Sequence, residues 1–532
     1  MGTWLRCFLV SVGARVDVDV RDEHGCTALA LAAKNGHAVA VAWLLARGAN
    51  PNLVDLDQAM PLWYAARHGH TAVVRLLLAS GRLSDLNPSV EGQTPLSIAL
   101  KHGHRKTAKL LAHAGGIDPF VKLRERGGPS TAISVVGLAI RNGYEDVALA
   151  LLNKCDPGRD SSHGSSDNNA AKDAVEPASK LLGFAASGGC CRIVRDLLAK
   201  HGADVNALYT YTEERDTSYN YDTFYQRSPL MEAARRGNAN VVRLLLDTEG
   251  IQPDLKGDHR KLTALSLAAE EGFVEVVKML VADVRVNPDQ TDKNGRTALS
   301  YAAERAHETV VAELLVTGAV NPDSPDDSGR TPLMWAVDPE DGYRPKGWQP
   351  YEGVVRHLIA SGRVNPNSRD SLGYTPLSLA ARNGSLGLVE AILQHPEADP
   401  ESGHQRTPLV QAAERGYAHV VRVLLDTGRV DVNAISVDYR HAEEGTALQC
   451  AARRGRQNVV QLSLSTPGID LDGKDQRGNT LLMIAASAGK GEIVKQLSAV
   501  AGIDPNIQDS RGQTALCKAS RLIHLSPRRG ER

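Results

Sequence analysis

Aromatic residues are scarce in this chain of 532 residues, since Trp, Tyr and Phe together make up only 4% of it. Large globular cores usually draw much of their buried area from aromatic side chains. Here Leu, Val and Ala must supply the core instead. That composition favours thin, closely stacked layers rather than one broad core.

Paired cysteines are also absent. The seven cysteines are odd in number and scattered, and they contain no Cys-x-x-Cys pair: Cys7, Cys26, Cys155, Cys190, Cys191, Cys450 and Cys517. Such a set indicates neither a disulfide framework nor a zinc knuckle. It fits a reducing compartment, so we expect the protein inside the cell, in the cytoplasm or the nucleus.

Neither sign of charge dominates, because 61 Lys and Arg residues stand against 62 Asp and Glu residues. Without a global basic field, nucleic acid is not expected as the main partner. The apolar run from Phe8 to Val12 is too short to span a bilayer. Together with Arg6 it also makes a poor secretory signal, and we expect no membrane insertion.

Catalytic motifs are missing too. The chain has no Gly-x-x-x-x-Gly-Lys-[Ser/Thr] phosphate loop, no Gly-x-Ser-x-Gly nucleophile turn and no kinase signature. His307 and Glu308 begin a zinc-protease pattern, but Val311 stands where the second histidine is needed. His-Gly-His at 68–70 and 102–104 is better explained by a repeated turn than by metal binding. We therefore predict no enzyme activity, no cofactor and no metal site.

What is present is a repeat, and residues 292–323 contain its unit. Thr297 is placed to cap a helix, and Leu299 begins an apolar stripe at helical spacing. After a break near Ala306 a second stripe begins at Val310, and Gly318 is suited to end that helix in a left-handed conformation. The unit is predicted to be two short helices and a hairpin. It is too small to bury its apolar face without neighbours.

Copies of this unit fill the chain. The position of Thr297, which we call the entry position, is occupied in the other units by Thr27, Met60, Thr94, Ser134, Lys180, Ser228, Thr263, Thr331, Thr375, Thr407, Thr446, Thr480 and Thr514. Five residues after every entry position stands an alanine, which indicates close approach of adjacent helices. Nine residues after most of them stands a glycine, where the turn between the helices needs a positive backbone angle.

This pattern resembles the ankyrin repeat over nearly the whole chain. The match lies in the period of about 33 residues, in Thr-Pro-Leu at 94–96, 331–333, 375–377 and 407–409, and in closing Gly-Ala pairs such as 48–49. The resemblance implies an all-α solenoid of helix-turn-helix units joined by β-hairpin fingers. The family often has histidine after Thr-Pro-Leu to tie units together. That histidine is missing here, so we expect weaker contacts between units.

The departures from the repeat divide the chain. We predict a partial leading repeat (1–20), ankyrin repeats (21–152), a disordered loop (153–178), one further repeat (179–206), an aromatic finger insertion (207–227), ankyrin repeats (228–513) with an insertion at 338–353, and a truncated final repeat with a tail (514–532). Neither end looks capped, so we expect a segment of a longer array or an incomplete one.

The finger at 207–227 is the most informative departure, because it gathers six aromatic residues: Tyr209, Tyr211, Tyr219, Tyr221, Phe224 and Tyr225. Clustered exposed aromatic residues are typical of binding surfaces, and the resemblance implies that fingers touch partners. Alternatively, the finger folds back and covers the adjoining groove with its own rings. The sequence leaves both possibilities open.

The resemblance implies a function without catalysis. We expect a monomeric scaffold or adaptor that binds protein partners through its concave face, which first helices and finger tips line. Arg260, Arg296 and Arg330 stand at finger positions and are further candidate contacts, although each is equally explained as a solvated surface charge. The alternative is a targeting arm of a larger enzyme or ubiquitin-ligase-type complex whose catalytic part lies outside this chain.

Overall fold

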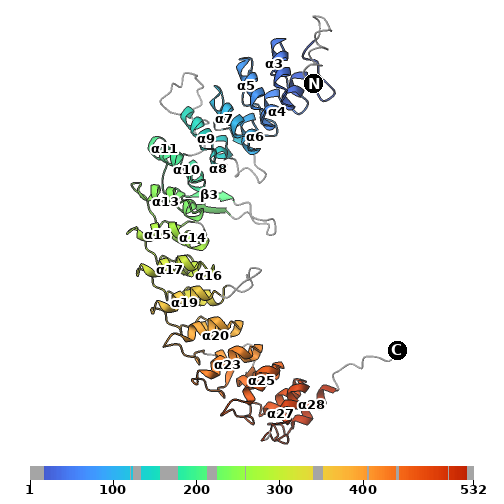
Figure 1. Cartoon of the computed structure of the whole chain (residues 1–532), viewed down its shortest axis with the longest axis vertical. Helices are drawn as coiled ribbons and strands as arrows, with labels where there is room; N and C mark the ends of the chain where they lie inside the picture. Colours follow the sequence, from blue (N-terminus) through green and yellow to red (C-terminus); the bar gives the residue numbers. More distant parts are fainter. Residues whose placement is uncertain are drawn as a thin grey trace, which may run out of the picture. The chain divides into compact units, whose positions relative to one another are not determined.

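The computed structural model describes residues 17–119, 121–123, 133–155, 178–212, 224–257, 259–339, 351–403, 407–438, 443–500 and 502–523. Figure 1 shows the chain, which divides into two compact units, residues 1–259 and 260–532. Each unit is a stack of short helix pairs. None of the helices in these ranges is both long enough and apolar enough to cross a membrane.

From α2 to α27, each repeat among the described residues consists of a first helix, a turn and a second helix, and α28 is a first helix. The first helices of the unit at 1–259 are α2 (Ala28–Lys34), α4 (Pro61–Arg67), α6 (Pro95–Lys101), α8 (Val135–Arg141), α10 (Ala178–Ser187) and α12 (Pro229–Arg235). Its second helices are α3 (Ala38–Ala46), α5 (Thr71–Ala79), α7 (Arg105–His113), α9 (Glu145–Leu152), α11 (Cys191–Lys200) and α13 (Ala239–Leu246), and a 3₁₀ turn (Asn153–Cys155) follows α9.

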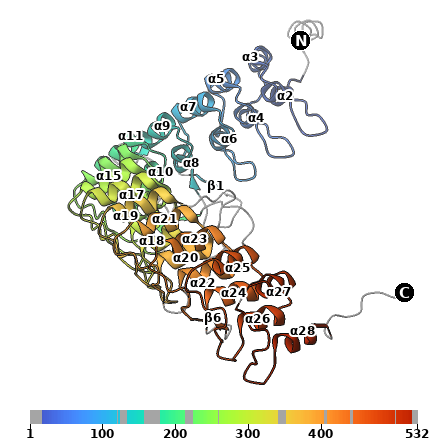
Figure 2. The ribbon, with the colours of Figure 1, turned by 60° about the horizontal axis from the view of Figure 1, so that its bottom comes forward.

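The unit at 260–532 continues the same order. Its first helices are α14 (Ala264–Glu271), α16 (Ala298–Glu304), α18 (Pro332–Val337), α20 (Pro376–Asn383), α22 (Pro408–Arg415), α24 (Ala447–Arg454), α26 (Leu481–Ser487) and α28 (Ala515–Ile523). Its second helices are α15 (Val274–Ala282), α17 (Glu308–Val316), α19 (Glu352–Ala360), α21 (Leu386–Leu393), α23 (Ala418–Asp426), α25 (Gln457–Leu464) and α27 (Gly491–Ser498). Within each unit, first helices pack on first helices and second helices on second helices (Figure 2).

The entry position starts the first helices, as predicted. The Thr297 hydroxyl accepts a hydrogen bond from the N–H of Ser300 at the start of α16. The same bond caps the helices that follow Thr27, Thr94, Ser134, Ser228, Thr263, Thr331, Thr375, Thr407, Thr446 and Thr514. Lys180 differs, because it lies inside α10, which begins at Ala178. A lysine side chain has no acceptor and cannot cap.

The core is distributed over the layers. The alanine five residues after the entry position is buried in every repeat from Ala32 to Ala485, and Ala519 in the last helix is partly exposed. Leu265, Leu299 and Leu333 occupy equivalent places in successive repeats and are all buried. The helices are therefore held by the layers before and after them, as the pattern predicts.

The turn glycines and the side chains that cover them tie neighbouring repeats together. In all eleven repeats that carry the glycine, its φ lies between 69° and 91°. At Gly69 a Cβ would also collide with the imidazole of His104 from the next repeat. His104 Nε2 donates to the carbonyl of Arg67 at 3.0 Å, and His70 bonds the carbonyl of Lys34 in the same way at 3.1 Å. A histidine at this position thus bonds its own repeat to the one before it.

The fingers are of two kinds. Among the described residues three fingers are antiparallel ribbons, formed by β1 (Lys122–Leu123) with β2 (Ile133–Ser134), β3 (Tyr209–Thr212) with β4 (Phe224–Arg227), and β5 (Ser436–Asp438) with β6 (Glu443–Gly445). Others are tight turns held by an aspartate five residues before the entry position. Asp292 Oδ1, for example, accepts from the N–H groups of Asn294 and Arg296 at 2.8 Å each. The predicted hairpins are confirmed, although many are shorter than a β-ribbon.

Most of the predicted departures from the repeat fall in residues 1–16, 156–177, 213–223, 340–350 and 524–532, which lie outside the described residues. The partial leading repeat, the loop, the insertion at 338–353 and the tail therefore stay predictions.

Candidate partner-binding surface

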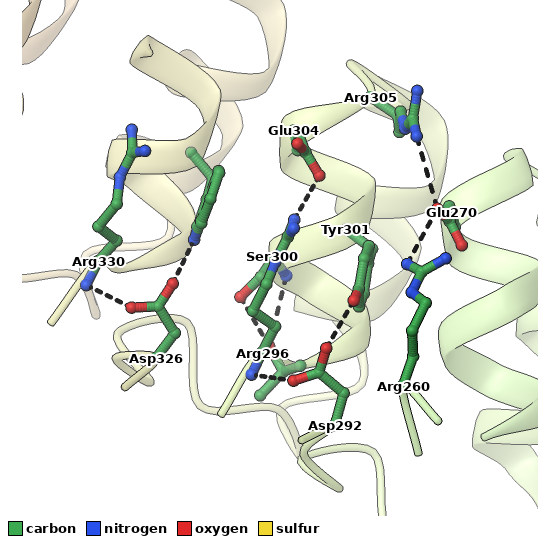
Figure 3. A network of polar contacts seen from close by, with 12 residues as sticks. Arg260, Glu270, Asp292, Arg296, Ser300, Tyr301, Glu304, Arg305, Asp326 and Arg330 are labelled. Carbon is green, nitrogen blue, oxygen red and sulfur yellow. Dashed lines mark hydrogen bonds and ion pairs between the residues drawn. The ribbon is translucent and has the colours of Figure 1, made fainter. Parts of the chain in front are cut away.

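A stack of arginine and aromatic side chains runs across the first helices that begin the unit at 260–532 (Figure 3). The Arg296 guanidinium lies 4.1 Å from the ring centre of Tyr301 and 4.0 Å from that of Trp335. Arg330 lies 4.1 Å from the Trp335 ring, and Arg260 lies 5.3 Å from the Tyr301 ring. We call these five residues the arginine-aromatic ladder. Cation–π attraction at such distances joins three consecutive repeats.

A carboxylate seven residues after the entry position neutralises each arginine of the ladder. Arg296 pairs with Glu304. Glu270 pairs with Arg260 at 3.2 Å and with Arg305 at 3.5 Å. Asp338 pairs with Arg330 at 3.8 Å and with Arg382 at 2.8 Å. Most of these groups are largely buried. Loss of one partner would leave the other charge poorly compensated, so the ladder stabilises the stack first of all.

Asp292 and Asp326 join their fingers to the rings of the ladder. While Oδ1 of Asp292 holds the finger turn, its Oδ2 accepts a hydrogen bond from the Tyr301 hydroxyl at 2.6 Å. Burial, followed by this hydrogen bond, raises the pKa of Tyr301 to about 12. Trp335 Nε1 donates to Asp326 Oδ2 at 3.0 Å in the next repeat. These two fingers are thereby hydrogen-bonded to the first helices that follow them.

The unit at 1–259 contains the same hydrogen bond between a ring and the aspartate of a finger, and sequence reasoning missed it. Tyr64 donates to Asp55 Oδ2 at 2.6 Å, and burial is the main cause that raises the pKa of Tyr64 above its usual range. In all three cases the aspartate precedes the entry position by five residues and the ring follows it by four. That spacing was visible in the sequence.

The predicted arginine contacts lie inside this ladder. The side chain of Arg296 is only 9% exposed and that of Arg330 is 15% exposed, whereas that of Arg260 is 30% exposed. The interpretation as solvated surface charges is therefore wrong for Arg296 and Arg330, because rings and carboxylates surround them. Contact with a partner stays a prediction for all three.

The aromatic finger is described only at its base. Strands β3 and β4 place Tyr211 opposite Tyr225 and put Phe224 one residue further toward the tip. Tyr209 is partly buried, and burial raises the pKa of its hydroxyl, which is also hydrogen-bonded to Ser179. The base of the finger thus contacts the start of α10. Tyr219 and Tyr221 lie outside the described residues.

Two observations on the described residues concern metal ligands and thiols. They contain no group of three or more His, Cys, Asp or Glu side chains that could hold a metal ion. Burial raises the pKa of the Cys190 thiol to about 11 and also raises that of Cys26. A thiol is a nucleophile only when ionised, so these two are poorly suited to catalysis. The arrangement is suited to presenting side chains on a rigid face.

Comparison with known proteins gives a consistent result. Residues 40–122, 182–292, 284–342, 349–436, 432–509 and 448–525 match a family model described as "Ankyrin repeats (3 copies)". Residues 12–58 match one described as "Ankyrin repeats (many copies)".

Similar curated proteins include the "Ankyrin repeat domain-containing protein SAT10" of Stachybotrys chartarum, 30% identical over 95 residues. The "Ankyrin repeat and KH domain-containing protein mask" of Drosophila melanogaster is 45% identical over 74 residues. These matches cover 18% and 14% of this chain, but only 5% and 2% of the respective relatives. Among solved structures, the ankyrin repeat domain of Bcl-3 aligns with 24% identity and a TM-score of 0.37, over 43% of this chain and 95% of that one.

Proposed function

The chain belongs to the ankyrin repeat family, and on that premise we propose that it is a non-enzymatic scaffold or adaptor that binds other proteins. Its binding face consists of the fingers and the first helices. Repeat architectures commonly bind proteins on such an extended face. The cross-links between finger, first helix and next repeat support this proposal, because a rigid face loses little conformational entropy when a partner docks.

Apolar side chains exposed on the fingers are the observation that carries the proposal. Leu56 is 74% exposed, Ile435 64% and Val20 64%, and Leu208 and Leu372 are also exposed. Large aliphatic side chains held on loops by a rigid scaffold are suited to the apolar part of a protein interface.

The aromatic finger is our first candidate for a contact site, with Tyr211, Tyr219, Tyr221, Phe224 and Tyr225 as its contact residues. Tyr209 at the base positions the finger through Ser179. Affinity capture from native lysate with the whole chain, repeated after removal of residues 209–225, tests this. Removal of residues 340–350, the other long insertion, is the matched control. Loss of a captured partner only after the first deletion supports the site, and unchanged capture refutes it.

The remaining expectations accompany this proposal. The partners are proteins rather than nucleic acid, the chain acts as a monomer, and it works in the cytoplasm or the nucleus. The balanced charge of 61 basic and 62 acidic residues supports the first of these. Sedimentation of the purified chain tests the second.

A second proposal, the targeting arm of an enzyme or ubiquitin-ligase-type complex, is favoured by one comparison. The curated relatives named above are far longer than this chain, which covers 5% or less of each. Arrays of this kind therefore occur within much larger proteins. Transferase activity that co-purifies with the captured complex and disappears with the partner would favour this proposal over a passive scaffold.

A further inference from the structure

The first helices that begin the unit at 1–259 end in a row of cations. Lys34, Arg67 and Lys101 are the last residues of α2, α4 and α6, and each stands seven residues after its entry position. All three side chains are exposed. The three helices lie side by side (Figure 2). We call these three residues the basic row, and Arg141 at the end of α8 continues it.

The basic row differs from the same position in the arginine-aromatic ladder. There, Glu270, Glu304 and Asp338 stand seven residues after the entry position and neutralise the arginines. In the basic row the cations themselves occupy that position. Within the part of the chain that the structure describes, Lys34, Arg67 and Lys101 form no ion pair with a carboxylate. The ladder is therefore neutralised by its own carboxylates, whereas the basic row carries positive charge that no described carboxylate pairs with.

The positive charges act together across repeats. His68 and His102 follow Arg67 and Lys101 directly in the sequence. Burial lowers the pKa of His68, and His70, Arg67 and Lys34 lower it further. Burial likewise lowers the pKa of His102, with further contributions from Arg67, His104 and Lys101. Cations from two neighbouring repeats thus act on each of these imidazoles.

The shape of the surface favours a narrow ligand. Glu23, Asp57 and Glu91 are exposed on the fingers of the same repeats. They lie at the opposite ends of the first helices, on the order of 10 Å from the row at 1.5 Å per helical residue. A nucleic acid duplex would meet these carboxylates as well as the cations. Trp63 and Tyr64 are only 5% and 8% exposed, so these rings offer no stacking platform for single-stranded bases.

The spacing matches an extended peptide. Packed helices lie about 8–10 Å apart, and a peptide in the extended polyproline II conformation rises about 3.1 Å per residue with three residues per turn. Every third side chain of such a peptide lies on the same face, about 9 Å from the one before it, and therefore meets the next cation of the row. We propose that the basic row binds an extended acidic segment of a partner protein, with an acidic residue at every third position. This inference rests on the proposed protein-binding function. It assigns that function a binding site, the basic row, and a negatively charged partner segment.

Fluorescence anisotropy with the full chain tests the proposal. The probe is a labelled peptide of twelve residues with glutamate at every third position and serine or threonine between. The variant is Arg67→Glu with Lys101→Glu. The matched control is Arg75→Glu with Arg195→Glu, because these two arginines are exposed on the second helices α5 and α11. We expect the first variant to bind the peptide at least about tenfold more weakly than the unchanged chain. The control variant should bind it with unchanged affinity.

Two further peptides make the test specific. A peptide of the same composition with its four glutamates adjacent should bind more weakly than the spaced one, and a glutamine version should not bind. Equal binding of the spaced peptide to both variants would overturn the proposal, as would tighter binding of a dT12 oligonucleotide than of the peptide.

Stability has to be measured in parallel, because cations at a helix C-terminus also interact favourably with the helix dipole. If Arg67→Glu with Lys101→Glu does not fold, Arg67→Gln with Lys101→Gln removes the charges without introducing repulsion, and its binding should weaken several-fold. Unchanged binding of this folded variant contradicts the proposal. If the chain still captures a partner through the aromatic finger while the acidic peptide fails, only the basic row is refuted.

Discussion

The guanidinium of Arg296 lies 4.0 Å from the indole of Trp335, which belongs to the next repeat. One side chain thus links two layers that share no continuous helix or sheet. Its Nε is buried without a hydrogen-bond partner among the described residues, and the adjacent rings supply the attraction instead. Stability along the stack therefore depends on such contacts between neighbours.

Replacement of Arg296 by alanine should destabilise the chain strongly. The change removes the stacking on Tyr301 and Trp335 and leaves Glu304 largely buried without its partner. A broken buried pair costs about 3 kcal/mol. Urea unfolding should show this loss, whereas Arg356→Ala should cost about 0.5 kcal/mol or less, because Arg356 is 59% exposed. Similar midpoints for the two variants would exclude the ladder as a stabilising device.

The Tyr301 hydroxyl should titrate near pH 12 in the folded chain, above the value of 10.0 for a free phenol. Because the folded pKa is the higher one, this phenol stabilises the fold fully below pH 10, and the contribution is lost as the pH rises through 12. Tyrosinate absorbance of the native chain and of Tyr301→Phe measures it. If the difference between the two titration curves is centred at pH 10.0, the value of a free phenol, the bond to Asp292 is absent.

The turn glycines allow a matched pair of substitutions. Gly69 and Gly81 both have positive φ, 73° and 63°, but only at Gly69 would a Cβ collide with a neighbouring side chain, that of His104. Gly81→Ala should cost about 1 kcal/mol for the backbone conformation alone. Gly69→Ala should cost clearly more, because His104 must also give up its bond to the Arg67 carbonyl. Equal thermal shifts for the two would mean that backbone conformation alone requires glycine.

Binding of an acidic peptide to the basic row should depend on pH through His68 and His102. The pKa values of His68 and His102 should lie below 6.5 in the free chain. A bound acidic peptide favours the protonated imidazoles and should raise both values. By linkage, the affinity for the spaced acidic peptide should increase as the pH falls through these values. Proton NMR with and without the peptide checks this, and pKa values that do not move would place the peptide elsewhere.

Local chemistry made much of the fold predictable. The cap at Thr297, the small side chain at Ala302 and the positive φ at Gly69 each recur at a fixed spacing in the repeats, and this spacing is visible in the sequence. The tie from His104 to the Arg67 carbonyl was not predictable in the same way, because the two residues belong to different repeats. Likewise, Arg296 appears as a surface charge until the rings of two repeats are placed around it.

The most direct test of the proposed function is hydrogen exchange of the full chain, with and without its captured protein partner. The account predicts that the partner slows exchange in the fingers and the first helices and leaves the exposed sides of second helices such as α5 and α11 unchanged. Slowed exchange confined to the second helices would contradict it.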